Sequence, residues 1–178
     1  MADLCKEYGG ALYLLAKETG KTAEFFSQLW EIKKLFEDNP SYVKLISSPA
    51  MSSSEKRALI EKAFGGKTEE YIVSFMHILS DRNYFSHFIG CVEHYKTAYY
   101  AENNISEGIA ISAVQLTDEE KEKIRKAVEA KLKNRKLILN FSVDETLLGG
   151  FYVEVDGKVF DSSVKTKLSG LKEELSKH

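Results

Sequence analysis

The feature that most constrains the fold is a change in the spacing of apolar residues near Asn103-Asn104. Before this point apolar side chains recur at the spacing of an amphipathic α-helix. After it they alternate with other residues in short runs, which is typical of β-strands. The sequence therefore predicts an α+β protein with an N-terminal six-helix bundle over residues 1–104 and a small C-terminal α+β domain over residues 105–178.

Helix start and stop residues divide the N-terminal part into its predicted helices. Gly20 ends the first apolar stripe, and Pro40 and Pro49 bound a short third helix. Ser52 and Glu55 form a capping-box pattern at the start of the fourth helix. Because the predicted connections are short, we expect consecutive helices to pack side by side.

The C-terminal part is expected to run strand, helix, strand, strand, short strand, helix. Thr117 and Glu120 repeat the capping-box pattern, and alternating runs that begin near Ile105, Leu137 and Phe151 predict strands. A domain of about 70 residues is marginal as an independent fold. We therefore expect it to depend partly on a partner or on the helical domain.

Three turn or cap signals lie close together near the end of the chain. Gly149-Gly150 suits a backbone with positive φ, and Asp156-Gly157 between two alternating runs predicts a hairpin. Asp161 and Ser162 are expected to cap a last helix. The apolar stripe of that helix consists of Val164, Leu168, Leu171 and Leu175.

The first helix contains two adjacent glycines, Gly9 and Gly10, beside Tyr8, Leu12 and Leu15. A glycine inside a helix costs about 1 kcal/mol relative to alanine, so close approach of another helix is the expected reason for each. Two explanations stay open at this point. The approaching helix belongs either to the bundle itself or to an external partner.

No group of residues predicts an active site, a cofactor site or a metal site. His87 and His94 are seven residues apart, whereas metal-binding pairs on a helix are usually three or four apart. Neither Gly65-Gly66 nor Gly149-Gly150 has the sequence context of a phosphate-binding loop. We expect a protein without enzymatic activity.

Composition narrows the classes of partner and compartment. The formal net charge is −2, and residues 105–178 hold as many acidic as basic side chains, which argues against nucleic acid as the main partner. No segment approaches the ~20 apolar residues of a membrane span, and no targeting leader is expected. Cys5 and Cys91 lack metal-type spacing and are expected to be free thiols.

Several segments in order resemble the δ subunit of F-type ATP synthases, the bacterial relative of the oligomycin-sensitivity-conferring protein. The similar segments are Tyr8–Leu12, Ser47–Lys56, Leu79–Asn83, Ile111–Thr117 and Val143–Val164. Gly9 replaces an alanine common in the family, and Leu148 stands where isoleucine is commoner. No single motif is specific, but their number, order and spacing extend over nearly the whole chain.

The resemblance implies a non-catalytic stator subunit of the ATP synthase that supports proton-driven ATP synthesis. It implies that the helical domain binds the amphipathic N-terminal helix of an α subunit through its first and fifth helices, and that the C-terminal domain binds the b subunits of the peripheral stalk. One copy per complex is expected, peripheral to the membrane at the cytoplasmic face of a bacterial cell. No cofactor is implied.

The predicted groove for the α helix combines apolar anchors with small residues that let two backbones approach. On the first helix the expected contacts are Tyr8, Ala11, Leu12 and Leu15, and on the fifth helix they are Phe75, Met76 and Leu79. Two other classes of protein stay as alternatives. One is a small ligand-binding protein or enzyme with a helical lid domain, and the other is a nucleic-acid adaptor, which a salt-dependent association would favour.

Overall fold

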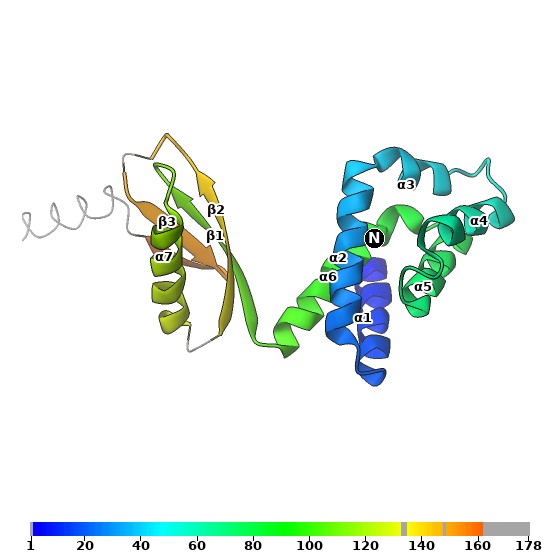
Figure 1. The fold of residues 1–178 in the computed structure, drawn as a ribbon, viewed down its shortest axis with the longest axis horizontal. Coiled ribbons are helices and arrows are strands. Elements are labelled where there is room, and N and C mark those ends of the chain that lie inside the picture. The colour runs from blue at the N-terminus through cyan, green and yellow to red at the C-terminus, as the bar shows by residue number, and fades with distance from the viewer. Residues whose placement is uncertain (1, 133–134, 148, 162–178) are drawn as a thin grey trace, which may run out of the picture. The chain divides into compact units, whose positions relative to one another are not determined.

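The computed structural model describes residues 2–132, 135–147 and 149–161. The chain divides into two compact units, Met1–Tyr100 and Ala101–His178. The first contains helices, and the described part of the second contains a four-stranded sheet and one long helix (Figure 1). The α+β class predicted from the change in apolar period is confirmed. The boundary after residue 104 stays a prediction about independent folding.

The helical unit is built from six α-helices and one short 3-10 helix in the described residues. Their bounds are α1 (Ala2–Glu18), α2 (Thr22–Asp38), α3 (Pro40–Ile46), α4 (Ser53–Phe64), α5 (Glu70–Asp81), η1 (Phe85–His87) and α6 (Phe88–Glu102). All contribute buried side chains to one core. The α2 stripe Phe25, Leu29, Ile32 and Phe36 is fully or almost fully buried, as its helical spacing requires.

Aromatic side chains fill the centre of this core. Phe36 of α2 lies against Phe64, Phe85 and Phe88, with ring centroids 5.0–5.8 Å apart. Tyr95 of α6 packs edge-to-face on Tyr13 of α1 at 5.3 Å. Offset and edge-on arrangements of this kind are the favourable geometries for aromatic pairs. Residues far apart in the sequence are thereby brought into one cluster.

Some helices of this unit begin with a side-chain cap or with a proline in the first turn, and others have neither. Ser52 and Glu55 form the complete capping box at α4, and Pro40 occupies the first turn of α3. Helix α5 begins at Glu70 without a side-chain cap. Phe85 lies in η1, which leads directly into α6.

Within residues 105–161, as far as they are described, the second unit is a mixed sheet in the order β2-β1-β3-β4 with one helix on it. Its elements are β1 (Ile105–Ser112), α7 (Asp118–Lys131), β2 (Lys136–Val143), β3 (Phe151–Val155) and β4 (Lys158–Asp161). Strands β1 and β2 are parallel, with Gly108 opposite Leu139, and α7 supplies the crossover that parallel neighbours need. The pairs β1–β3 and β3–β4 are antiparallel.

The turn residues adopt the backbone conformations that their types permit. Asp156 and Gly157 have φ of 50° and 73° and join β3 to β4 as a two-residue hairpin, in which Val155 faces Lys158. Gly149 and Gly150 have φ of 133° and 83°. The Gly150 carbonyl accepts a hydrogen bond from the amide of Ala113 at 3.1 Å, which fixes the entry into β3.

Asp161 is the last residue of β4 and pairs with Tyr152. The helix that it was expected to cap, with Val164, Leu168, Leu171 and Leu175, lies outside the described residues, as does Ser162. The cap therefore stays a prediction.

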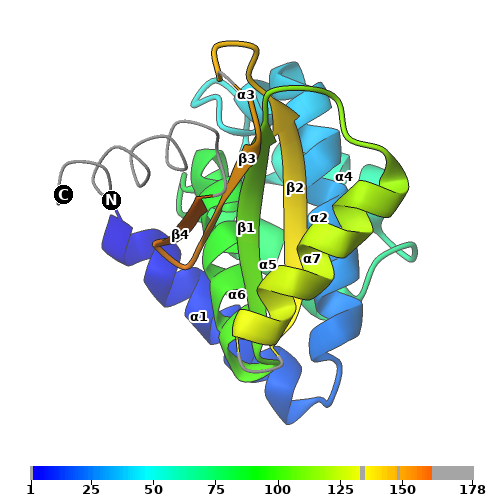
Figure 2. The same ribbon diagram turned by 90° about the vertical axis from the view of Figure 1, so that its left-hand side faces the viewer.

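Helix α7 covers one face of the sheet, as Figure 2 shows. Ile124 and Val128 of α7 are buried against the sheet side chains Ala110, Val153 and Val155. Because side chains alternate along each strand, Ile109 and Val159 lie on the other face, where they are 38% and 61% exposed. No element of the described residues buries that second face.

Candidate partner-binding site

The surface predicted to bind a helix combines side chains from α1 and α5 with different exposure. On α1, Ala11 is exposed and Tyr8 and Leu15 are half-buried, but Leu12 is only 4% exposed. On α5 the predicted contacts, Phe75, Met76 and Leu79, are all buried in the core. Leu12 and these three side chains belong to the core of the unit, and their part in binding stays a prediction.

Other apolar residues of the same two helices do reach the surface. Leu14 of α1 is 61% exposed, and Tyr71 and Ile78 of α5 are 46% and 48% exposed. Sequence reasoning passed over these three because it followed the apolar stripes. The sequence could have indicated two of them, since Leu14 and Ile78 lie outside the helical stripes of apolar residues that the bundle buries. An isolated exposed leucine is ordinary, so the observation gains weight only from its position beside Ala11.

Tyr8 links α1 to the chain segment that follows α5. Its ring packs edge-to-face on Tyr84, with centroids 6.2 Å apart, and Tyr84 in turn lies 6.3 Å from the His87 ring. Leu12 and the buried α5 side chains share one core cluster. The structure thus brings most of the predicted residues together around a common core, while their role in binding stays a prediction.

The two glycines of α1 serve different purposes. A Cβ added to Gly9 would meet the backbone carbonyl oxygen of Cys91 well inside van der Waals contact and would lie 3.0 Å from the Cβ of His94. Gly9 is therefore required by the close approach of α6, a helix of the same unit. Beside Gly10 there is open space, with no atom within 4 Å of an added Cβ. The internal explanation holds for Gly9, and Gly10 has no packing partner there.

A polar flank borders α5 on the side of α4. Arg57 of α4 pairs with Asp81 through its guanidinium, and His77 Nε2 lies 2.8 Å from Glu61 Oε1. The hydrogen bond from Arg57 holds the pKa of the Asp81 carboxyl below its usual value. The Arg57–Asp81 ion pair is partly exposed, so it orients the α4–α5 surface more than it stabilises it.

An apolar surface pocket of about 670 Å³ lies elsewhere on the helical unit, between α2, α3 and α4. Its walls include Phe36, Tyr42 and Phe64, and the exposed Leu35 and Leu45 lie at it. Sequence reasoning did not predict this pocket, because its lining residues come from three helices. It contains no cluster of titratable side chains that would suit catalysis.

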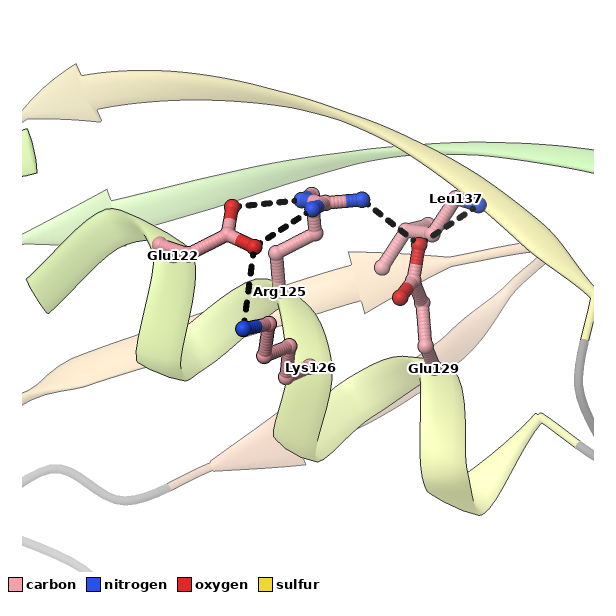
Figure 3. A network of polar contacts seen from close by, with 5 residues as sticks. All are labelled: Glu122, Arg125, Lys126, Glu129 and Leu137. Carbon is pink, nitrogen blue, oxygen red and sulfur yellow. Dashed lines mark hydrogen bonds and ion pairs between the residues drawn. The ribbon is translucent and has the colours of Figure 1, made fainter. Parts of the chain in front are cut away.

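Helix α7 presents a charged surface that is also fastened to the sheet (Figure 3). Arg125 donates hydrogen bonds to Glu122 at 2.6 and 3.0 Å and to Glu129 at 2.9 Å. Glu129 also accepts a hydrogen bond from the backbone amide of Leu137 at 3.2 Å, which ties the end of α7 to β2. Lys126 extends the network as an ion pair with Glu122. These charged side chains therefore hold α7 against the sheet and also make its outer surface polar.

Two properties of the described residues bear on other functions. They contain no group of three or more His, Cys, Asp or Glu side chains placed to hold a metal ion. Among the described helices, none has the length and apolar character needed to cross a membrane.

Comparison with known proteins gives consistent matches over nearly the whole chain. A family model described as ATP synthase delta (OSCP) subunit matches residues 4–175. The ATP synthase subunit delta of Halalkalibacterium halodurans is 30% identical over 97% of this chain and 94% of the relative. That of Prochlorococcus marinus is 31% identical over 96% and 94%.

A solved structure has the same fold at low sequence identity. A chain in the cryo-EM structure of the Toxoplasma gondii mitochondrial ATP synthase hexamer aligns with a TM-score of 0.74 and 16% identity, over 97% of both chains. At this identity the likeness supports the fold only.

Proposed function

The chain belongs to the ATP synthase delta (OSCP) subunit family, and we propose that it joins the α subunit N-terminus to the b subunits of the peripheral stalk. The observation that carries this function is the family match over residues 4–175, supported by relatives named ATP synthase subunit delta across 94% of their own length. It is a non-catalytic stator subunit of a membrane-associated ATP synthase.

The finer assignments are part of the proposal. Helices α1–α6 act as the six-helix bundle that receives the α N-terminal helix, and the C-terminal unit meets the ends of the b subunits. One copy serves each complex, at the cytoplasmic face of the membrane. A tether that resists rotor torque needs slow dissociation, and two linked contacts raise the effective affinity above that of either one.

The exposed residues of α1 and α5 are the best support for the α contact. Ala11 and Leu14 face outward one turn apart on α1, beside the open position at Gly10. Ile78 supplies exposed apolar area on α5. An amphipathic helix that binds through apolar anchors needs such a surface, and Leu12, Phe75, Met76 and Leu79 make it rigid from beneath.

Co-purification tests the stator assignment. The tagged full-length protein is isolated from its native membranes, and the proteins that travel with it are identified by mass spectrometry. We expect α, β and b subunits of the ATP synthase. Recovery of the protein without any of these subunits, under conditions that keep the enzyme assembled, would contradict the assignment.

Calorimetric titration of an α N-terminal peptide tests the surface. We expect Ala11→Arg and Leu14→Arg to weaken binding at least tenfold, or about 1.4 kcal/mol. Leu35→Arg is the matched control, because Leu35 is exposed to a similar degree at the apolar pocket. Thermal melts of all variants separate binding from folding. Equal affinities for the Leu14 and Leu35 variants would place the contact elsewhere.

A further inference from the structure

The two cysteines, distant in the sequence, meet at the close approach of α1 and α6. The Cys5 thiol is directed at the backbone carbonyl of His87, with 3.9 Å between sulfur and oxygen. A Cβ added to Gly90 would lie 2.8 Å from Cys5 Sγ. Cys91 is the next residue, and its own carbonyl oxygen packs on Gly9, one turn beyond Cys5 on α1. Glycine on each helix therefore allows the two thiol-bearing turns to face each other.

The two thiols interact and differ in exposure. Cys5 is partly exposed, whereas Cys91 is 1% exposed, and both are free. Burial, together with the charge and hydrogen-bonding capacity of the neighbouring Cys5 thiol, raises the pKa of the Cys91 thiol to about 12. A dissolved oxidant therefore meets Cys5 first, and Cys91 is the neighbouring thiol that can react next.

We propose that Cys5 and Cys91 are a reversible dithiol–disulfide site that fastens α1 to α6, with a small soluble disulfide as its oxidant. The Cys5 thiolate, having lost its proton to water, attacks one sulfur of the small disulfide. A mixed disulfide forms at Cys5, and one small thiolate leaves. Cys91 then loses its proton and attacks Cys5 Sγ, which releases the second small thiolate. The protein loses two protons and two electrons, and the small disulfide takes them up to become two thiols.

The order of exposure predicts which step is slow. At neutral pH only a small fraction of the protein carries Cys91 as a thiolate, because burial raises the pKa of this side chain. The second step is therefore slower than the first, and the mixed disulfide at Cys5 is expected as a transient species.

The bond would change the mechanical properties of the helical unit. It would close a loop from α1 to α6 and restrict the unfolded chain, which stabilises the folded state more as the loop lengthens. It would also hold α1, the helix that carries Ala11 and Leu14, at the Gly9 contact. The inference goes beyond the stator role and does not depend on which partner binds α1.

Redox titration of the full-length chain tests the proposal. The protein is equilibrated with graded ratios of oxidised to reduced glutathione, alkylated, and analysed by intact and peptide mass spectrometry. We expect a loss of two hydrogens, one linked peptide pair containing Cys5 and Cys91, and a thermal midpoint raised by roughly 10 °C. Dithiothreitol should reverse both changes.

Two variants separate this site from incidental oxidation. Cys91→Ala should accumulate a stable glutathione adduct on Cys5, and Cys5→Ser should lose both the adduct and the shift in midpoint. If wild type gives only an adduct at Cys5, only a disulfide between two chains, or free thiols at every ratio, the proposal is overturned. A Cys5–Cys91 disulfide that leaves the midpoint unchanged would overturn the fastening of α1.

Discussion

The phenol of Tyr95 on α6 donates a hydrogen bond to the backbone carbonyl of Thr22, the first residue of α2, at 2.9 Å. Tyr95 is fully buried, so this bond satisfies the one polar group that the side chain carries into the core. It joins the start of the second helix to the last helix of the unit. The same ring packs on Tyr13 of α1, and one side chain therefore connects three helices.

Removing the Tyr95 hydroxyl should destabilise the helical unit by a small and measurable amount. Tyr95→Phe keeps the ring contact with Tyr13 but loses the bond to Thr22, so we expect the free energy of unfolding to fall by about 0.5–1.5 kcal/mol. Urea denaturation followed by circular dichroism measures this change. Tyr84→Phe is a matched control, since that partly exposed hydroxyl has no hydrogen-bond partner among the described residues. A loss of the same size in both variants would show that the bond to Thr22 contributes nothing specific.

The same tyrosine makes stability depend on alkaline pH. Burial raises the pKa of Tyr95 above its ordinary value of about 10. Since the unfolded chain then loses this proton before the folded one does, the contribution of Tyr95 is fully present below about pH 10 and is lost as the pH rises through the folded pKa. We expect the free energy of unfolding to fall less steeply above pH 10 in Tyr95→Phe than in wild type.

Denaturation midpoints at about pH 9 and pH 11 test this expectation. Burial also raises the pKa of Tyr42 and of Cys91, so the variant should keep part of the alkaline loss. If the denaturation midpoint falls equally with pH in wild type and in Tyr95→Phe, Tyr95 does not contribute to the alkaline loss of stability.

The hairpin between β3 and β4 should tolerate asparagine but not a branched residue. Gly157 has φ of 73°, where a side chain such as valine is strained, so Gly157→Val should destabilise the C-terminal unit by about 1–3 kcal/mol. Gly157→Asn is the control, because asparagine adopts positive φ more readily than valine and leaves the contacts of Asp156 with Ser106 and Arg135 in place. The denaturation midpoint of wild type and both variants is the measurement. A midpoint unchanged by valine would mean that the turn relaxes without cost.

Local sequence chemistry was enough to predict most elements of the described residues, whereas the binding surface stays a prediction. The spacing of Phe25, Leu29, Ile32 and Phe36 and the Asp156-Gly157 turn each depend on neighbours in the chain, and they appear in the structure as helix and hairpin. A helical stripe identifies the side chains that a helix buries somewhere. It cannot say whether the bundle or a partner buries them, and the bundle itself buries Phe75, Met76 and Leu79.

Contacts between segments that are distant in the chain could not be predicted from local sequence patterns. The meeting of Cys5 with Cys91 depends on how α1 crosses α6, and no local pattern encodes a crossing. The start of α5 depends on such a contact as well. The amide of Glu69 donates a hydrogen bond to the Gln28 side chain of α2 at 2.8 Å, so a residue of another helix supplies the partner for the amide just before α5.

The two adjacent glycines of α1 give the most direct test of how that helix packs. Gly9→Ala would place a methyl group against the backbone carbonyl of Cys91, which cannot rotate away, so α1 and α6 must separate. We expect a loss of about 1–3 kcal/mol, the usual cost of overpacking a tight core contact. Gly10→Ala meets open space and gains helix propensity, so it should stabilise the unit by about 0.5–1 kcal/mol. The two substitutions add the same atoms at neighbouring positions, and each serves as the control for the other. Urea denaturation under reducing conditions measures both, and hydrogen exchange of α1 amides should quicken only in the Gly9 variant. Stabilisation by both substitutions would mean that α6 does not approach α1 at Gly9.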